Sequence, residues 1–138
     1  MKTVTFQFPN LPISINALYD INYRQRRVDL KPAARQWKSA GKGYVPQFKI
    51  ADDSMLAIDF TFHYPYYNAK NSLRIFDSAN LLKLAIDCIC ERLEINDCRV
   101  KSGSWSSVDD ERTCVEVTLR EVTNGKLHQT ETNNQKGD

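Results

Sequence analysis

Apolar and polar residues alternate along three stretches of the chain, with the two-residue period of a β-strand. These stretches are residues 3–8, 55–64 and 113–122, and residues 99–108 are predicted as a further strand. In the first, Val4, Phe6 and Phe8 share one face and polar residues occupy the other. Alternation of this kind indicates that each strand buries one face. We therefore expect a sheet of about four strands, mixed or antiparallel.

Two further stretches have the period of a helix. One runs from Pro32, which suits a first helical turn, to about Lys42, where neighbouring glycines weaken the pattern. The other runs from about residue 79 to residue 91, and Asn80, Lys83 and Asp87 share one of its faces at i, i+3 and i+7. The opposite, apolar face consists of Leu81, Leu82, Ala85, Ile86 and Ile89. Strands and two helices predict a single small α+β domain.

The rest of the chain predicts loops and a tail. Residues 9–29 form a long and mostly irregular loop, and loops of that length in compact domains tend to be functional. From residue 123 onward the chain is polar and nearly free of apolar residues, so we expect it to be disordered or loosely attached. The domain is therefore assigned to residues 1–122 and the tail to residues 123–138.

Charge is divided unevenly along the chain. The chain as a whole has a net charge of +2. Its first part, residues 1–50, has nine Lys/Arg and two Asp/Glu, whereas the remainder has ten Lys/Arg and fifteen Asp/Glu. Eight of these nine basic residues lie between residues 24 and 49, and they are Arg24, Arg26, Arg27, Lys31, Arg35, Lys38, Lys42 and Lys49. Such a cluster neutralises phosphates and releases counterions, or it is simply a solvated basic surface. Tyr19, Tyr23 and Trp37 lie among these charges and either stack on bases or pack in the core.

Candidate chemistry concentrates between Asp77 and Val100. Carboxylates grouped around Lys83 suggest a magnesium site acting on phosphate, because Mg²⁺ needs carboxylate oxygens and phosphodiester hydrolysis needs positive charge at the reacting oxygens. Asp77, just before the helix, is either a ligand or a helix cap. The helix is about 18 Å long at about 1.5 Å per residue. An extended segment from Arg92 to Asp97 spans about 20 Å at most at roughly 3.3 Å per residue, which is just enough to return Asp97 to Asp77. The two aspartates are therefore expected to meet within one subunit or across a dimer.

Other chemistries find little support in the sequence. Cys88 and Cys90 cannot face each other on a helix, and no CxxC pair completes a zinc site, so reduced thiols and a cytoplasmic location are expected. Only His63 and His128 are present, which argues against a histidine triad. No targeting signal or apolar stretch of about 18 residues is present, so no membrane association is expected.

The motif Asp77-x-x-Asn80-Leu81-x-Lys83, followed by Asp87 and later by Asn96-Asp97, resembles that of the RusA family of Holliday junction resolvases. The N-terminal half is similar to the family as well. There the likeness rests on Phe8-Pro9, on Pro12-Ile13-Ser14-Ile15-Asn16, on Tyr19 and on Leu30 to Trp37. The resemblance covers roughly residues 3 to 122.

The resemblance implies a homodimeric endonuclease that binds four-way DNA junctions and cuts them by paired nicks, with Mg²⁺ or Mn²⁺ and no small-molecule cofactor. Asp77 and Asp97 would hold the metal, Lys83 would stabilise charge on the phosphate or the leaving oxygen, and Asp87 would orient Lys83 or a metal-bound water. We expect DNA contacts from Asn16, Tyr19, Arg24, Arg26, Arg27, Lys31, Arg35 and Lys38. A phage or prophage origin, and hence the host cytoplasm, also fits the family.

Ala79 departs from the family motif, in which a second aspartate occupies this position. The substitution fits a branch that holds its metal through Asp77, Asp97 and Asp87 with added waters, a member that binds junctions without cutting them, or an engineered change that traps substrate. A more distant alternative is an interaction protein whose basic surface meets an acidic partner.

Overall fold

The computed structural model describes residues 2–11, 19–22, 24–30, 32–74 and 78–123 of the chain. The predicted tail, apart from Thr123, therefore lies outside the described residues. Among the helices of the described part, none is long and apolar enough to cross a membrane.

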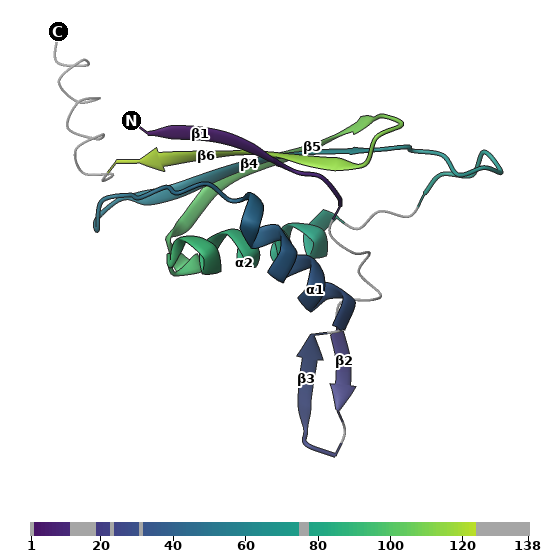
Figure 1. The fold of residues 1–138 in the computed structure, drawn as a ribbon, viewed down its shortest axis with the longest axis horizontal. Helices are drawn as coiled ribbons and strands as arrows, with labels where there is room; N and C mark the ends of the chain where they lie inside the picture. Colours follow the sequence, from purple (N-terminus) through teal and green to yellow (C-terminus); the bar gives the residue numbers. More distant parts are fainter. Residues whose placement is uncertain (1, 12–18, 23, 31, 75–77, 124–138) are drawn as a thin grey trace, which may run out of the picture.

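The core of the fold is a four-stranded sheet in the order β1-β6-β4-β5 (Figure 1). Its strands are β1 Thr3–Phe8, β4 Met55–Tyr64, β5 Val100–Asp109 and β6 Cys114–Val122. The β1–β6 and β4–β6 pairs are antiparallel, and β4–β5 is parallel. A parallel pair needs a crossover, which here passes through helix α2, Ser78–Leu93. The predicted sheet of four strands is confirmed, and of the two predicted types, mixed or antiparallel, it is mixed.

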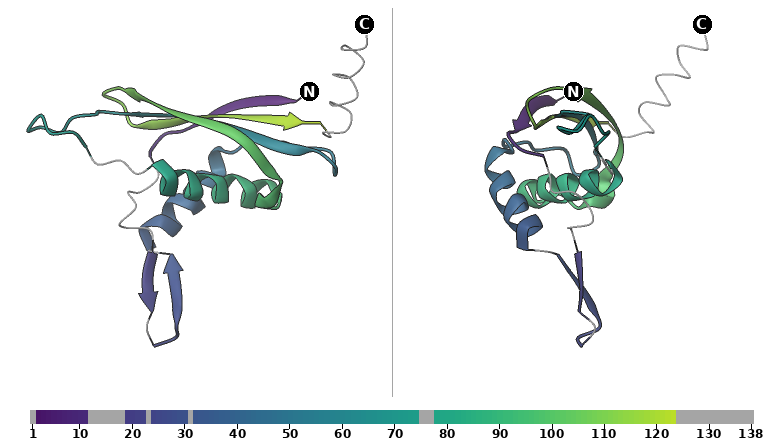
Figure 2. Two further views of the ribbon diagram at one scale, coloured as in Figure 1. Left: turned by 180° about the vertical axis from the view of Figure 1, so that it is seen from behind. Right: turned by 90° about the vertical axis from the view of Figure 1, so that its right-hand side faces the viewer.

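Two helices cover one face of this sheet (Figure 2). They are α1, Pro32–Gly41, and α2. The largest fully buried side chains between the layers are Phe8, Leu56, Phe62, Ile89, Val115, Val117 and Leu119. Trp37 packs on Phe8, with ring centroids 5.0 Å apart, so of its two predicted roles the structure shows packing. Gly41 lets α1 end close to α2, because a Cβ there would lie 3.0 Å from the Cys88 sulfur.

The opposite face of the sheet carries polar side chains that bond to one another. Asp59 accepts hydrogen bonds from Ser104 Oγ at 2.8 Å and from Arg120 Nε at 2.9 Å. The hydroxyls of Thr5 and Thr118 lie 3.1 Å apart. This face is therefore polar without needing a covering layer, as antiparallel strands with one solvated side commonly are.

The long N-terminal loop was predicted to be mostly irregular, and that prediction was wrong for its second half. Residues there form a separate two-stranded antiparallel hairpin of β2, Tyr19–Asn22, and β3, Arg27–Leu30. The hairpin projects away from the sheet beyond α1 (Figure 1). Arg26 has φ of 50°, a left-handed conformation that helps close the tight turn between the strands.

Candidate functional site

Helix α2 has a deeply buried side that fixes its place under the sheet. The residues of this side are Leu81, Leu84, Ala85, Cys88 and Ile89, each no more than 3% exposed. Lys83 is exposed and Asp87 is half-buried on another side. The predicted amphipathic helix is thus present, and it presents charged groups away from the core.

Leu82 and Ile86 lie at the edge of the predicted apolar face. Both are half-buried and pack against the core, and they also line the same surface hollow as Lys83 and Asp87. The reason is geometric, because each residue advances about 100° around an α-helix, so the 82/86 stripe is the immediate neighbour of the 83/87 stripe. The hollow therefore has an apolar wall and a charged wall from one helix.

A tight reversal after α2 brings the chain back toward the helix. Glu94 has φ of 56°, and the Ile95 N–H donates to the Cys90 carbonyl at 3.0 Å. This pattern satisfies a carbonyl at the helix end and turns the chain sharply. A short 3₁₀ helix, η3 (Asp97–Arg99), follows, and the side chain of Asn96 caps it by accepting from the Cys98 N–H at 3.0 Å.

Arg99 anchors this reversal to the turn before β4. Its Nε and Nη2 donate to the Ser54 carbonyl at 3.2 and 2.9 Å, and Nη2 also donates to the Ala51 carbonyl. A guanidinium that spans two carbonyls fixes the orientation of the segment that carries it. The position of Asp97, two residues earlier, is therefore set by backbone contacts outside the hollow.

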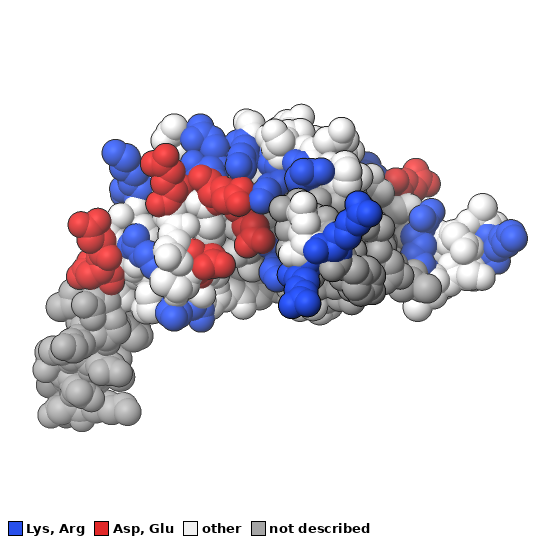
Figure 3. All heavy atoms as spheres, turned by 90° about the horizontal axis from the view of Figure 1, so that it is seen from below, with Lys and Arg blue, Asp and Glu red and all other residues white. Residues whose placement is uncertain are grey.

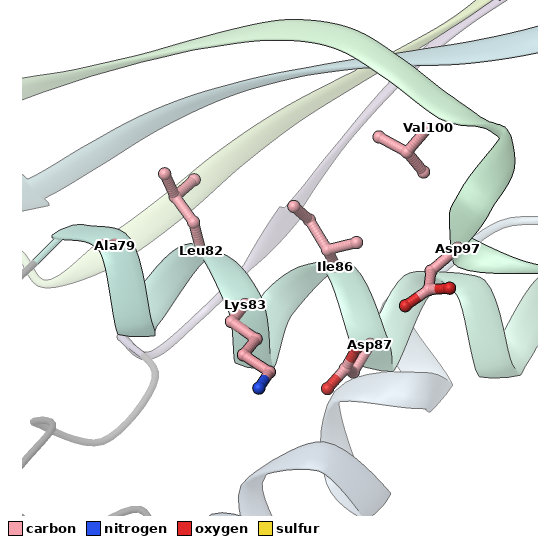
Figure 4. Close-up of a pocket in the computed structure, with 7 residues that line it drawn as sticks. All are labelled: Ala79, Leu82, Lys83, Ile86, Asp87, Asp97 and Val100. Atoms are coloured by element: carbon pink, nitrogen blue, oxygen red, sulfur yellow. The ribbon is translucent and has the colours of Figure 1, made fainter.

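The hollow that results has a volume of about 320 Å³ (Figure 4). It is lined by Ala79, Leu82, Lys83, Ile86, Asp87, Asp97 and Val100. Leu82 and Ile86 point toward the sheet, where Val100 also lies, while Lys83 and Asp87 point away from the sheet. Asp97 extends from η3 over the part of α2 that carries Asp87. A second hollow, of about 420 Å³, adjoins the first and shares both aspartates with it.

The surroundings of Asp87 disfavour its charged form. Burial raises the pKa of Asp87 above its usual value, Lys38 and Lys83 oppose the rise, and the nearby charges of Asp97 and Glu91 add to it. Two carboxylates that share a partly buried site repel each other. A bound cation would relieve that repulsion.

Glu91, one turn further along α2, forms ion pairs with lysines of α1 and of the 3₁₀ turn that follows it. Its carboxylate oxygens lie 2.9 Å from Lys38 Nζ and 3.0 Å from Lys42 Nζ. Although burial opposes the change, hydrogen bonds from both lysines lower the pKa of Glu91. Lys38, predicted as a DNA contact, therefore forms an ion pair with Glu91 at the α1–α2 contact.

The other predicted DNA contacts are spread over the hairpin and α1. Arg24 and Arg26 are exposed in the hairpin turn, and Arg35 is exposed on α1. Tyr19 and Arg27 lie on β2 and β3, where the description covers the backbone alone. Seen from the helix side, basic side chains surround an area of carboxylates (Figure 3). Asn16 and Lys31 lie outside the described residues.

The predicted metal ligands are brought together only in part within the described residues. Asp97 meets Asp87 and Lys83 around one hollow, whereas Asp77 lies outside the described residues and the side chain of Asn80 is not described. In the described part of the chain no three His, Cys, Asp or Glu side chains are grouped closely enough to hold a metal ion. Two carboxylates still fit Mg²⁺, because this ion commonly keeps several waters.

The thiols of α2 have no reactive character. Burial raises the pKa of Cys88 and of Cys90 to about 11 each, so both stay protonated near neutral pH. All four cysteines are free, and Cys98 alone among them is exposed. The expected reduced thiols are consistent with this arrangement.

His63 has a more structured environment than the sequence indicated. It is only 8% exposed, and its Nδ1 lies 3.1 Å from Asp110 Oδ2. Its Nε2 lies 3.1 Å from Glu116 Oε1 without the alignment of a hydrogen bond. His63 lines neither hollow around Asp87 and Asp97. The sequence signal for this cluster is the acidic run Asp109-Asp110-Glu111, a composition that is also typical of a turn.

Comparison with known proteins adds no relative. No protein-family profile matches the chain, and no curated protein is similar enough to count as a relative. The resemblance to the RusA family therefore rests on the motif residues of the sequence.

Proposed function

We propose that this protein is a magnesium-dependent, structure-selective endonuclease that resolves four-way DNA junctions by paired phosphodiester hydrolysis. The observation that carries the proposal is the hollow in which Asp87, Asp97 and Lys83 converge from α2 and η3. Oxygen ligands for a hard cation and a lysine for a phosphate are what this reaction requires.

The chain's own groups would divide the work. Asp97 and Asp87, with Asp77 expected as a third ligand, would hold the ion. Lys83 would place its ammonium against the scissile phosphate or the leaving oxygen, and the neighbouring Asp87 carboxylate would keep that ammonium oriented. Bound Mg²⁺ supplies polarisation of the phosphoryl oxygen and a more acidic water.

The basic surface would hold the arms of the junction. Arg24 and Arg26 in the projecting hairpin and Arg35 on α1 are exposed and suited to phosphate contacts, which position DNA without reading its sequence. A homodimer with two-fold symmetry would present the same hollow to each of two opposed strands. The proposed place of action is the cytoplasm.

One observation favours a second candidate, a protein that binds junctions without cutting them. Ala79 lines the hollow and contributes a methyl group where the family motif has a carboxylate. If two or three carboxylates hold Mg²⁺ too weakly, the same surface would bind branched DNA and leave it intact.

The test is a labelled, immobile four-way junction incubated with the protein in Mg²⁺ and, separately, in EDTA. We expect paired nicks in Mg²⁺ alone, and we expect Asp97→Asn and Asp77→Asn to lose cutting while still shifting the junction. Glu111→Gln, which changes an exposed acid in the turn after β5, is the matched control and should cut normally.

The other outcomes separate the candidates. A junction that is shifted but stays intact in Mg²⁺ identifies the binder. If the protein does not bind DNA even at low salt, the alternative in which its basic surface binds an acidic protein partner is favoured. Undiminished cutting by Asp97→Asn contradicts the assignment of the hollow.

A further inference from the structure

A second projection of the molecule lies at the other end of the sheet from the N-terminus. Residues 65–74, here called the arm, continue from β4 past the end of the sheet (Figure 1). The arm leads through residues 75–77, which are not described, into α2 and its hollow. No function discussed so far uses it.

The arm has a defined shape because its own backbone bonds hold it. Tyr67 pairs with Leu73 in an antiparallel bridge, and the Arg74 N–H donates to the Tyr66 carbonyl at 2.7 Å. At the tip, the Asn68 N–H donates to the Ser72 carbonyl at 2.8 Å, and the Asn68 side chain accepts from the N–H groups of Lys70 and Ser72 at 2.9 and 3.0 Å. The side chains of the arm are thus presented on a small preformed ribbon.

The base of the arm is tied to β5. Asp109 Oδ1 accepts from the Tyr66 N–H at 3.0 Å, and the Tyr66 hydroxyl lies 3.1 Å from Ser107 Oγ. The ring of Tyr66 also packs on that of Tyr64, with centroids 5.1 Å apart. A ligand held by the arm would therefore have a fixed position relative to the sheet and to the start of α2.

The exposed surface of the arm is apolar and basic. Tyr67 is 55% exposed and Leu73 is 68% exposed, and as bridge partners they stand on the same face of the ribbon. Lys70 and Arg74 are exposed as well, and residues 65–74 contain no Asp or Glu. Figure 3 shows basic side chains along this projection.

This combination suits an unpaired nucleotide. A tyrosine ring beside an apolar side chain offers a flat surface on which a base can stack, and base stacking on aromatic rings tolerates any sequence. Two cations within a few residues supply phosphate contacts. A base inside an intact duplex is already stacked on its neighbours, so the arm would select DNA in which bases are unpaired.

We propose that the arm binds an unpaired base at the branch point of DNA, with Tyr67 stacking on the base and Lys70 and Arg74 holding the adjoining phosphates. This inference rests on the proposed function, because it adds a branch-point contact to the same DNA complex. It extends the proposed DNA interface from the hairpin and α1 to the arm.

The experiment measures binding of the full chain in EDTA, so that cutting plays no part. The probes are a four-way junction with one unpaired 2-aminopurine at its centre, a linear duplex and a single strand of the same composition. We expect Tyr67→Ala to weaken binding to the junction and the single strand about 5- to 150-fold, and to change duplex binding little. The 2-aminopurine fluorescence should be quenched by the wild type and by Tyr67→Phe, but not by Tyr67→Ala.

Matched controls come from elsewhere on the surface. Tyr44, 51% exposed in the 3₁₀ helix Lys42–Tyr44, is replaced by alanine, and this variant should bind all three probes as the wild type does. Lys70→Ala and Arg74→Ala should each reduce the slope of log K against log salt by about one. Lys101→Ala, which removes an exposed cation on β5, should leave the slope unchanged.

Several results would overturn the arm's role. Wild-type affinity of Tyr67→Ala for the junction, or an equal loss on all three probes, contradicts base stacking. A change of sedimentation in Tyr67→Ala shows instead that the arm binds a second copy of the chain. A wild type that binds in EDTA but does not cut in Mg²⁺ defeats only the proposed nuclease, whereas one that binds none of the probes defeats both proposals.

Discussion

The buried side of α2 stabilises the folded state, whereas the side that faces the hollow carries a carboxyl group whose charge is disfavoured there. Ile89 and Ala85 are fully buried and contribute to the fold through packing. Asp87, on the other side, has a raised pKa because burial and the nearby Asp97 disfavour its charge. Residues that lower stability where they stand are typical of functional sites. The two sides of this helix can therefore be tested separately, the buried side by measuring stability and the other side by measuring ligand binding.

We expect the greatest loss of stability from a substitution on the buried side of α2. Ile89→Ala removes part of a fully buried side chain and leaves a cavity, so the free energy of unfolding should fall by about 2–5 kcal/mol. Denaturant titration measures the change. Lys83→Ala, on the exposed side of the same helix, is the control and should stay within about 0.5 kcal/mol of the wild type. Equal losses for both variants would show that the two sides are not distinct.

Glu91→Gln tests the contact between α1 and α2. The change weakens two ion pairs with partly exposed lysines, and each such pair contributes about 0.2–1 kcal/mol. Because the pKa of Glu91 is lowered in the folded protein, this stability is present above the unfolded pKa and is lost as pH falls through the folded value. The free energy of unfolding of the wild type and of Glu91→Gln, measured between pH 3 and pH 7, should therefore become equal at the acid end. A difference that stays constant with pH would contradict the ion-pair origin.

Ala79→Asp adds a carboxylate to the hollow and tests whether the proposed site lacks a metal ligand. The first turn of α2 has no acidic residue, so the helix dipole should stabilise the new carboxylate by about 0.3–1 kcal/mol. Junction cutting in Mg²⁺ should rise if the proposed site is short of a ligand. Ala79→Asn, which adds an uncharged side chain of similar size, controls for shape. A stable variant with no gain in cutting would favour a metal arrangement that does not involve position 79.

The smallest expected effect concerns the charge of Asp87. A carboxyl whose folded pKa is raised stabilises the fold below the unfolded pKa, and this contribution is lost as pH rises through the folded value. The stability of Asp87→Asn relative to the wild type should therefore increase with pH above about 4 and then level off. Added Mg²⁺ should stabilise the wild type more than the variant. A flat difference across this range would show that the hollow does not strain Asp87.

The strong periodicities made most of the fold predictable. The bounds of β1 and β4 were predicted as observed, and those of β5 and β6 differ by one residue at one or both ends. Helix α2 extends by one residue at its start and two at its end, which is the usual uncertainty at helix ends. The hairpin of β2 and β3 was missed because its strands have four residues each, too few for a period of two to stand out.

The candidate site was less predictable than the helix that carries it. Chain length showed that Asp97 could return to the helix, but length does not give direction. The direction comes from the left-handed Glu94, the Asn96 cap and the Arg99 contacts. These depend on tertiary contacts, and so the convergence of Asp97 with Asp87 could be suggested from the sequence only through a family resemblance.

The contacts of Arg99 have a consequence for any genetic screen of this protein. Arg99 lines neither hollow, yet its guanidinium holds the segment that carries Asp97 against the carbonyls of Ala51 and Ser54. Loss-of-activity alleles should therefore include Arg99 and insertions near residue 52, although neither Arg99 nor the turn at residue 52 lines the hollow. Such alleles would yield well-folded protein with a misplaced aspartate, and a search confined to ligand residues would overlook them.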